Sequence, residues 1–452
     1  MEEKKLGGFD IFMLIVCGIM FADAIASNSS AGVPSITWWV ILGVLYMIPS
    51  GLIIGELSGF LPDEGGIYVW IYEGLGPKWA AFTSWLFFAC GLFIPVSSFM
   101  MCSDILFTLF YPAASFTVRI VVALVLIWVL AWVSTLPMVE SQWITNLAGI
   151  IKLALFIGCG VAGLAFIMKG NAVSNPFTGE ALAPTLDESL EFLPIIVYCC
   201  TGMELASASA GEMKDPAKQL PKVVVGCAAL AVVLNVIANA GMLAVLPMDA
   251  IDLDLGLLDA FEIGFGSHAI YTIAGVLLLF SVFVQCVTWL VGGNRGTQEG
   301  AAAGDLPKFL AIEKNGQPLG AILTTAIAGS VLLVFYAFFS ESAADLFFAL
   351  LNCGVIGSLL PYVFMIVAYQ RLRKTEAWQS YEGFKCPGGI ALSWIVQIIQ
   401  CATLLLMLYI PGYGLAPDFV TSVIGTVIMV GAGILAIRVA ERENAGKAEV
   451  SE

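Results

Sequence analysis

The sequence predicts an all-α membrane protein whose chain crosses the bilayer as 12 transmembrane helices. Hydrophobic residues make up 60% of the chain, charged residues 12%, and the mean hydropathy is +0.94. Soluble domains carry about 25% charged residues, so this composition indicates a polytopic membrane protein. Apolar stretches of about 20 residues, the length that spans a bilayer, recur along the whole chain. Basic residues collect in alternate connections between them.

The twelve predicted spans follow one another with mostly short connections. The third is long enough to tilt steeply or to extend past the bilayer. The connections 247–266 and 292–317 are too short for separate domains, so residues 1–452 form a single predicted domain. The predicted spans are 9–31, 38–60, 79–110, 118–136, 143–168, 190–210, 222–246, 269–291, 319–339, 344–370, 390–410 and 420–439.

The distribution of lysine and arginine predicts the orientation of the chain. With the N-terminus in the cytoplasm, only Arg119 and Lys169 fall on the external side. Apart from Lys152, which lies inside a span, every other basic residue then falls on the cytoplasmic side. This asymmetry follows the positive-inside rule and predicts an N-in, C-in topology. The tails 1–8 and 440–452 are therefore expected in the cytoplasm, and the protein in the cell membrane.

Several function classes find no support in the sequence. The net charge is −15 and no basic face is present, which argues against a nucleic-acid partner. The eleven cysteines show no Cys-x-x-Cys pair, and His268 is the single histidine, so no metal site is expected. Nucleotide-binding and hydrolase motifs are absent as well. We therefore expect neither an enzyme nor a cofactor.

Spans one and six share a pattern that suggests an internal repeat. Each has an acid followed by small residues down to a glycine, from Asp23 to Gly32 and from Glu204 to Gly211. A separation of five spans gives the two segments opposite orientations, as an inverted repeat requires. The predicted repeats are 9–168 and 190–370, with 390–439 outside them. Small residues also mark close helix packing, which is the alternative explanation.

Asp23 and Glu204 are carboxylates at membrane depth. Placing one there costs about 2.5–3.5 kcal/mol on insertion scales, so such groups usually face a cavity or a partner. Gly202 beside Glu204 allows the helix to open around a protein-lined site. The two acids suit cation recognition or proton uptake. Alternatively, each caps a broken half-helix or pairs with a neighbouring hydroxyl.

Lys152 is the only basic residue deep in a predicted span and needs a carboxylate or several carbonyls as partners. It suits a coupling role, because a buried lysine loses its proton readily, or a structural pairing in place of a bound cation.

Tyr198 and Trp289 are aromatic residues that could close over an ammonium group through cation–π attraction. Single aromatics in spans also serve as packing residues or interfacial anchors.

Three segments resemble one known family. They are GELSGFLPDEGGIYVW with GLGPKW at 55–79, TGME with EMKDP at 201–216, and Trp289 with GNR and GDLP at 293–307. Together they resemble the amino acid–polyamine–organocation superfamily over about residues 9–439, nearest to its glutamate:γ-aminobutyrate antiporter branch. The resemblance implies a LeuT-type fold with a 5+5 inverted repeat, two further helices, broken spans one and six, and alternating access.

The resemblance also implies roles for individual residues. Glu204 is similar to an acid that links proton binding to gating in arginine/agmatine exchangers. Trp289 is similar to a gating tryptophan, and Tyr198 to an aromatic that stacks on substrate. Lys152 is similar to a lysine that takes the place of a sodium ion in several relatives. We therefore expect gating and proton coupling at Glu204 and Lys152.

The sequence departs from the family pattern in span one. Amino acid transporters of the family usually have Gly-Ser/Ala-Gly there, and this chain has Ala22-Asp23-Ala24. A carboxylate 4 Å from a unit charge interacts with it by about 4 kcal/mol at an effective dielectric of 20. It would repel an α-carboxylate and attract an ammonium group. The predicted substrate-binding residues are Asp23, Ala24, Ala26, Tyr198, Cys199, Thr201, Gly202 and Trp289.

The expected function is secondary-active transport of amino acids, their decarboxylated amines or polyamines, by antiport or proton coupling. The expected partners are a small-molecule amine or amino acid, membrane lipid and protons as the coupling ion. One alternative is a conventional proton-coupled amino acid permease in which Asp23 is protonated or turned aside. Another is a non-transporting ligand sensor on the same fold, which the lack of a signalling module in the short tails disfavours.

Overall fold

The computed structural model describes residues 6–136, 138–184, 190, 193–338, 343–411, 414–415 and 419–450, and these are almost entirely helical. The elements of the first part are α1 Gly8–Ile19, η1 Ala22–Ala24, α2 Ile25–Ser30, α3 Pro34–Leu42, η2 Gly43–Met47, α4 Ile48–Phe60, α5 Ile67–Leu75, α6 Pro77–Phe110, α7 Phe116–Val133 and α8 Met138–Met168. Those of the second part are α9 Leu193–Tyr198, η4 Met203–Glu212, α10 Pro216–Val245, η5 Met248–Ala250, α11 Gly256–Phe265, α12 His268–Ala302, η6 Lys308–Ala311, α13 Leu319–Ala337, α14 Ala343–Leu372, α15 Glu376–Gln379, α16 Gly389–Leu406, β1 Tyr409–Ile410, β2 Gly414–Leu415 and α17 Phe419–Val450.

The predicted class of helical membrane protein is confirmed. Within the described residues, 11 helical segments are long and apolar enough to cross a membrane. A shorter apolar helix, Leu319–Phe335, lies where the ninth span is predicted. The count is therefore eleven or twelve, depending on this one segment.

Several connections contain more helix than the hydropathy pattern predicts. Helix α12 continues to Ala302, so residues 292–302 of the predicted loop 292–317 are helical. Helix α17 continues to Val450, and most of the predicted C-terminal tail is helical as well. Hydropathy reports the apolar environment of a residue, whereas backbone hydrogen bonds continue a helix beyond that environment.

One further connection and the end of one span also differ from the prediction. The acidic connection 247–266 contains η5 and α11. The eleventh span ends earlier than predicted, because α16 stops at Leu406 and Tyr409–Ile410 pairs antiparallel with Gly414–Leu415.

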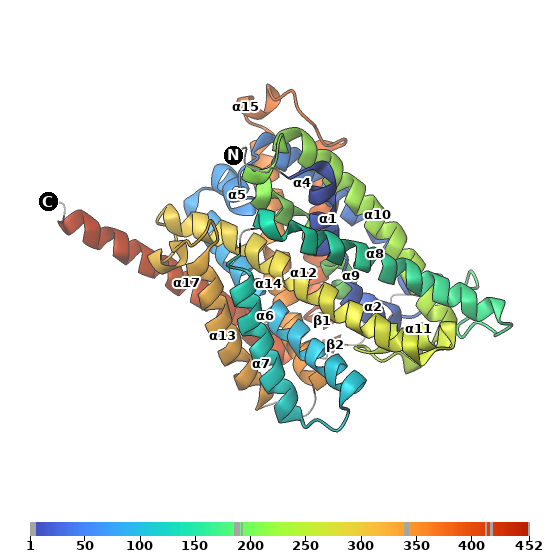
Figure 1. The fold of residues 1–452 in the computed structure, drawn as a ribbon. Helices are drawn as coiled ribbons and strands as arrows, with labels where there is room; N and C mark the ends of the chain where they lie inside the picture. The colour runs from blue at the N-terminus through green and yellow to red at the C-terminus, as the bar shows by residue number, and fades with distance from the viewer. Residues whose placement is uncertain are drawn as a thin grey trace.

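The helices form one bundle around the long helix α6, which packs against α12 and α14 (Figure 1). At 34 residues, α6 is about 51 Å long at 1.5 Å per residue, more than a bilayer core requires. The N-terminus and α15 lie at one end of the bundle, and α11 lies at the opposite end (Figure 1). We call the end with α11 the outer face, because the pattern of basic residues predicts that it is external.

Spans one and six are both interrupted near the middle of the bundle. Span one leaves helical geometry at Met20. Span six is non-helical at Cys199 and Cys200, between the end of α9 and the start of η4. Gly202 adopts a φ of +100°, which disfavours any residue with a Cβ. A Cβ added there would lie 3.5 Å from the Gly18 carbonyl oxygen, so the two interruptions lie side by side.

Candidate functional site

The interruption of span one leaves carbonyl groups at the end of α1 without helical partners. Two long side chains supply the missing donors. The Lys152 ammonium nitrogen lies 2.6 Å from the Cys17 carbonyl oxygen, and the Trp289 indole N–H donates to the Gly18 carbonyl at 2.9 Å. A cation at a helix C-terminus also interacts favourably with the helix dipole. Lys152 and Trp289 therefore stabilise the broken end of span one.

Lys152 is connected to Asp23 through Gln285. The Lys152 side chain is fully buried and donates a second hydrogen bond to the Gln285 amide oxygen. The amide of Gln285 is in turn within hydrogen-bonding reach of the Asp23 carboxyl group. The sequence predicts a carboxylate or several carbonyls as partners of Lys152. The contacts are one backbone carbonyl and one side-chain amide that connects to the carboxylate.

Asp23 faces a small cavity between spans one, three, six and ten. The volume is about 10 Å³, which is room for about one water molecule. The Asp23 Oδ1 atom and the Tyr198 hydroxyl are both buried and have no hydrogen-bond partner among the described residues. Buried polar atoms normally have partners, so these two atoms mark a place where a ligand group could bind. The cavity is lined by Phe21, Asp23, Ala24, Ser27, Ile94, Ser98, Ile195, Tyr198 and Leu351.

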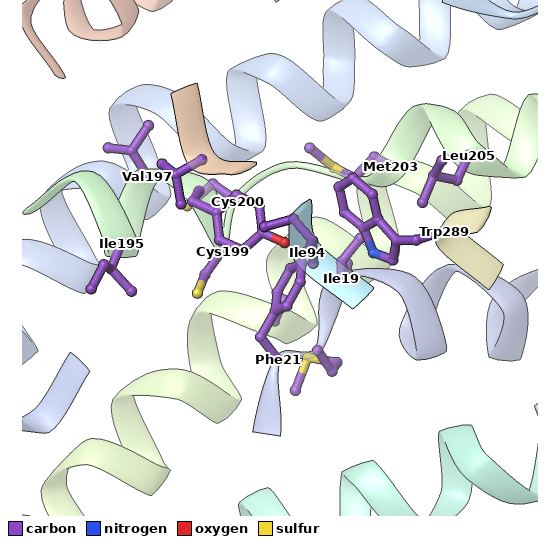
Figure 2. Packing of buried hydrophobic residues seen from close by; sticks show 14 of the residues in the cluster. Ile19, Phe21, Ile94, Ile195, Val197, Cys199, Cys200, Met203, Leu205 and Trp289 are labelled. Carbon is purple, nitrogen blue, oxygen red and sulfur yellow. The ribbon is translucent and has the colours of Figure 1, made fainter. Parts of the chain in front are cut away.

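Three aromatic rings pack together beside this cavity. The ring centroids of Phe21 and Tyr198 lie 4.8 Å apart, and those of Phe21 and Trp289 lie 5.9 Å apart. Tyr198 and Trp289 complete the group at 6.1 Å. Figure 2 shows Phe21, Ile94 and Trp289 among the apolar side chains around the interrupted segment of span six. Because the rings fill the space, a ligand larger than water requires them to move.

Glu204 lies on the other side of the interruption. Its side chain is buried, and the Tyr362 hydroxyl donates to its Oε2 atom. The same hydroxyl accepts the Gly202 backbone N–H at 2.8 Å, so Tyr362 bridges the interruption of span six. The Oε1 atom has no partner within the described part of the chain. The pairing with a hydroxyl is the alternative that the sequence left open for this residue.

The predicted substrate-binding residues fall into two groups. Asp23, Ala24 and Tyr198 line the cavity, while Gly202 and Trp289 lie beside it. The other three are engaged elsewhere. Ala26 packs against the start of α11, where its Cβ would lie 3.3 Å from a Cβ added to Gly256. The Cys199 sulfur accepts a hydrogen bond from the Asn28 side chain. The Thr201 hydroxyl donates to the Tyr198 carbonyl at 2.6 Å.

Sequence reasoning missed Phe21, Gln285 and Tyr362. Phenylalanine and tyrosine are common in apolar helices, and a single glutamine carries no charge that would mark it. Only the packing of distant helices brings Gln285 to Lys152 and Tyr362 to Glu204, across 133 and 158 residues of chain. No local signal distinguishes these positions.

Comparison with known proteins identifies the family of this chain. The family model described as "Amino acid permease" matches residues 6–434. A Lactococcus lactis protein named "Probable agmatine/putrescine antiporter" is 28% identical over 88% of this chain and 87% of its own length. The L-asparagine permease of Escherichia coli is 24% identical over 97% of this chain and 90% of its own length. A glutamate/gamma-aminobutyrate antiporter of Lactococcus lactis is 22% identical over 69% and 64%.

Solved structures show the same fold. The crystal structure of the Eremococcus coleocola manganese transporter, in complex with an aromatic bis-isothiourea substituted compound, matches with a TM-score of 0.58 at 14% identity. The match covers 96% of this chain and 94% of that one. The family match, together with the many apolar helices, identifies a multi-pass membrane transporter and not an enzyme. The chain belongs to the amino acid permease family.

Proposed function

We propose that this protein is an antiporter for organic amines that binds the ammonium group of its substrate at Asp23. The observation that carries the proposal is the Asp23 Oδ1 atom, which is buried beside a cavity and has no partner among the described residues. A buried carboxylate oxygen without a partner is costly, and an ammonium group would satisfy it. Tyr198, whose hydroxyl also has no partner in the described part of the chain, lines the same cavity.

Electrostatics and aromatic packing both favour an amine over an amino acid. At 4 Å and an effective dielectric of 20, a carboxylate attracts an ammonium group by about 4 kcal/mol and repels a substrate carboxylate by as much. Phe21, Tyr198 and Trp289 lie close enough together to surround a cation with aromatic faces. The relative named as an agmatine/putrescine antiporter supports the same class of substrate.

In this proposal Gln285 transmits the charge state of Asp23 to Lys152. An ammonium group on Asp23 would compete with the Gln285 amide for the carboxylate and change the contact of Gln285 with Lys152. Lys152 holds the end of α1 through Cys17, so substrate binding would act on the interruption of span one. Glu204 and Tyr362 would act in the same way on span six, with protons as the coupling ion.

The remaining features of the proposal concern the whole chain. Residues 1–452 form one transporter domain that alternates access by moving the halves of spans one and six against the rest of the bundle. The inverted repeat, with 9–168 and 190–370 as its halves, and the N-in, C-in orientation belong to this proposal. They are supported by the pattern of acids and small residues and by the distribution of basic residues.

A second candidate is a conventional proton-coupled amino acid permease. The similarity to L-asparagine permease over 97% of this chain favours it. In that case Asp23 would be neutral or would serve only as the counter-charge of Lys152. The two candidates differ in substrate and in their dependence on the Asp23 charge.

The test is exchange in proteoliposomes preloaded with putrescine, agmatine, asparagine or glutamate, comparing the wild type with Asp23→Asn. We expect rapid exchange of the two amines by the wild type. Asp23→Asn should weaken amine binding about 30-fold or more, because a buried charge pair contributes 2 kcal/mol or more. Exchange of asparagine or glutamate alone, unchanged in Asp23→Asn, would establish the permease instead.

A further inference from the structure

A second group of carboxylates lies at the outer face, apart from the Asp23 cavity. The connection between α10 and α12 carries Asp252 and Asp254, and Asp104 lies near them at the end of α6. Asp254 is only 8% exposed, and its Oδ1 atom has no hydrogen-bond partner in the described part of the chain. Such an oxygen, buried and within electrostatic reach of two further carboxylates, is a strong acceptor for which the described residues supply no donor.

Local cations do not neutralise this group. Arg119 of α7 forms an ion pair with Asp104, but Asp254 has no ion pair among the described residues. The Asp252 side chain instead accepts the backbone N–H groups of Asp254 and Leu255, at 2.9 and 2.8 Å, and so fixes the backbone that carries Asp254. Three carboxylates with one guanidinium leave the group with an excess of negative charge when all are ionised.

Two observations connect this group with the region of Asp23. Cys102 of α6 is within electrostatic reach of both Asp23 and Asp254. The segment after Asp254 packs on span one, because a Cβ added to Gly256 would lie 3.3 Å from the Ala26 Cβ. A cation that enters from the outer face along this side of span one would therefore pass Asp254 before it reaches Asp23.

We propose that Asp254, with Asp104 and Asp252, forms an outer binding site for the ammonium group of an amine that moves between the external solution and Asp23. The inference rests on the proposed amine antiport and adds a second site to it. A metal ion is a weaker fit, because these carboxylates do not converge closely enough to form a metal-ligating group within the described ranges. Negative charge at the mouth of a pathway raises the local concentration of cations and their rate of entry.

The charge state of Asp254 supports this assignment. Burial, together with the charges of Asp104 and Asp252, raises the pKa of Asp254 to about 7. The other charged groups nearby are Arg119, which pairs with Asp104, and two acids of α11, Asp259 and Glu262. Asp259 interacts electrostatically with both Glu262 and Asp252. An ammonium group binds the ionised carboxylate, so its affinity for the outer site should rise between pH 6 and pH 8.

The test is equilibrium binding of radiolabelled putrescine to the purified full-length protein, scored as equivalents bound per folded chain. We expect two equivalents for the wild type and one each for Asp23→Asn and Asp254→Asn. The equivalent that Asp23→Asn retains should bind more tightly at pH 8 than at pH 6. Asp249→Asn is the matched control, since Asp249 is an exposed acid of the same connection, and it should still bind two.

Asp252→Asn provides a second variant, because asparagine can still accept the two backbone hydrogen bonds while the charge is lost. It should weaken the outer equivalent about tenfold. If the wild type binds one equivalent of putrescine, and neither Asp254→Asn nor Asp252→Asn changes that binding, this inference is overturned. The proposed function would then still stand. Absence of any putrescine binding to the wild type would overturn both.

Discussion

Two buried glutamates of this protein differ sharply in their hydrogen bonds. Glu56 of α4 and Glu204 of η4 are 0% and 3% exposed, and each accepts a hydrogen bond from a tyrosine of α14. Glu56 accepts from Tyr369 at 2.6 Å, and it also accepts from the Trp378 indole at 2.7 Å and the Cys386 backbone N–H at 2.9 Å. Arg373 adds an ion pair at 3.4 Å.

Glu204 has far fewer partners. Tyr362 donates to one of its oxygens, and the other has no partner within the described residues. A fully satisfied buried carboxylate stabilises one arrangement of the chain, whereas a partly satisfied one can change its protonation or partner at lower cost. The comparison indicates that Glu56 fixes α4 to the segment after α14, and it supports the proposed role of Glu204 as the group that responds during transport.

Glu56→Gln should have the largest effect on stability. Both oxygens of Glu56 accept hydrogen bonds, so either orientation of the glutamine amide turns an NH2 group toward a donor. It also removes the counter-charge of Arg373, and breaking a buried pair costs about 3–5 kcal/mol. The midpoint of thermal unfolding in detergent should fall strongly. A midpoint like that of the wild type would mean that Glu56 is not a structural centre.

Replacing the tyrosine that bonds each glutamate should have the next largest effect and should distinguish Glu204 from Glu56. Tyr362→Phe leaves both the Gly202 N–H and one Glu204 oxygen without a partner, which should cost about 1–3 kcal/mol and slow exchange. Tyr369→Phe is the matched control seven residues along the same helix. It removes one of several partners of Glu56, so it should cost about 1 kcal/mol and leave the exchange rate unchanged. Equal effects on exchange would contradict the distinction.

Glu204→Gln should have the smallest effect on stability. The glutamine oxygen can accept from Tyr362, and its NH2 group can take the position of the oxygen that has no partner. We expect a change below about 1 kcal/mol in the free energy of unfolding. Exchange should lose its dependence on pH between 5.5 and 8, measured beside Glu73→Gln, an exposed acid of α5. A pH profile that matches the wild type would exclude Glu204 as the proton-coupling group.

The sequence predicts the class of the protein and the charged members of its site, but not the partners of those residues. Asp23, Lys152 and Glu204 are recognisable because charges are rare at membrane depth. Gln285 and Tyr362 carry no such signal, and only helix packing brings them to Lys152 and Glu204. Glu56 lies in a motif of the family, yet its partners come from residues 369–386, which no local pattern connects to it.

The eleven cysteines provide a native set of chemical labels for following transport. Ten of them are buried, and Cys401 alone is exposed. Cys17 lies at the end of α1 that Lys152 holds, Cys199 contacts Asn28 of α2, and Cys286 lies within electrostatic reach of Asp23. Opening of the Asp23 cavity would expose these thiols to water-soluble maleimides. The unmodified protein can therefore report its own conformational cycle by mass spectrometry, with protection by substrate as the readout.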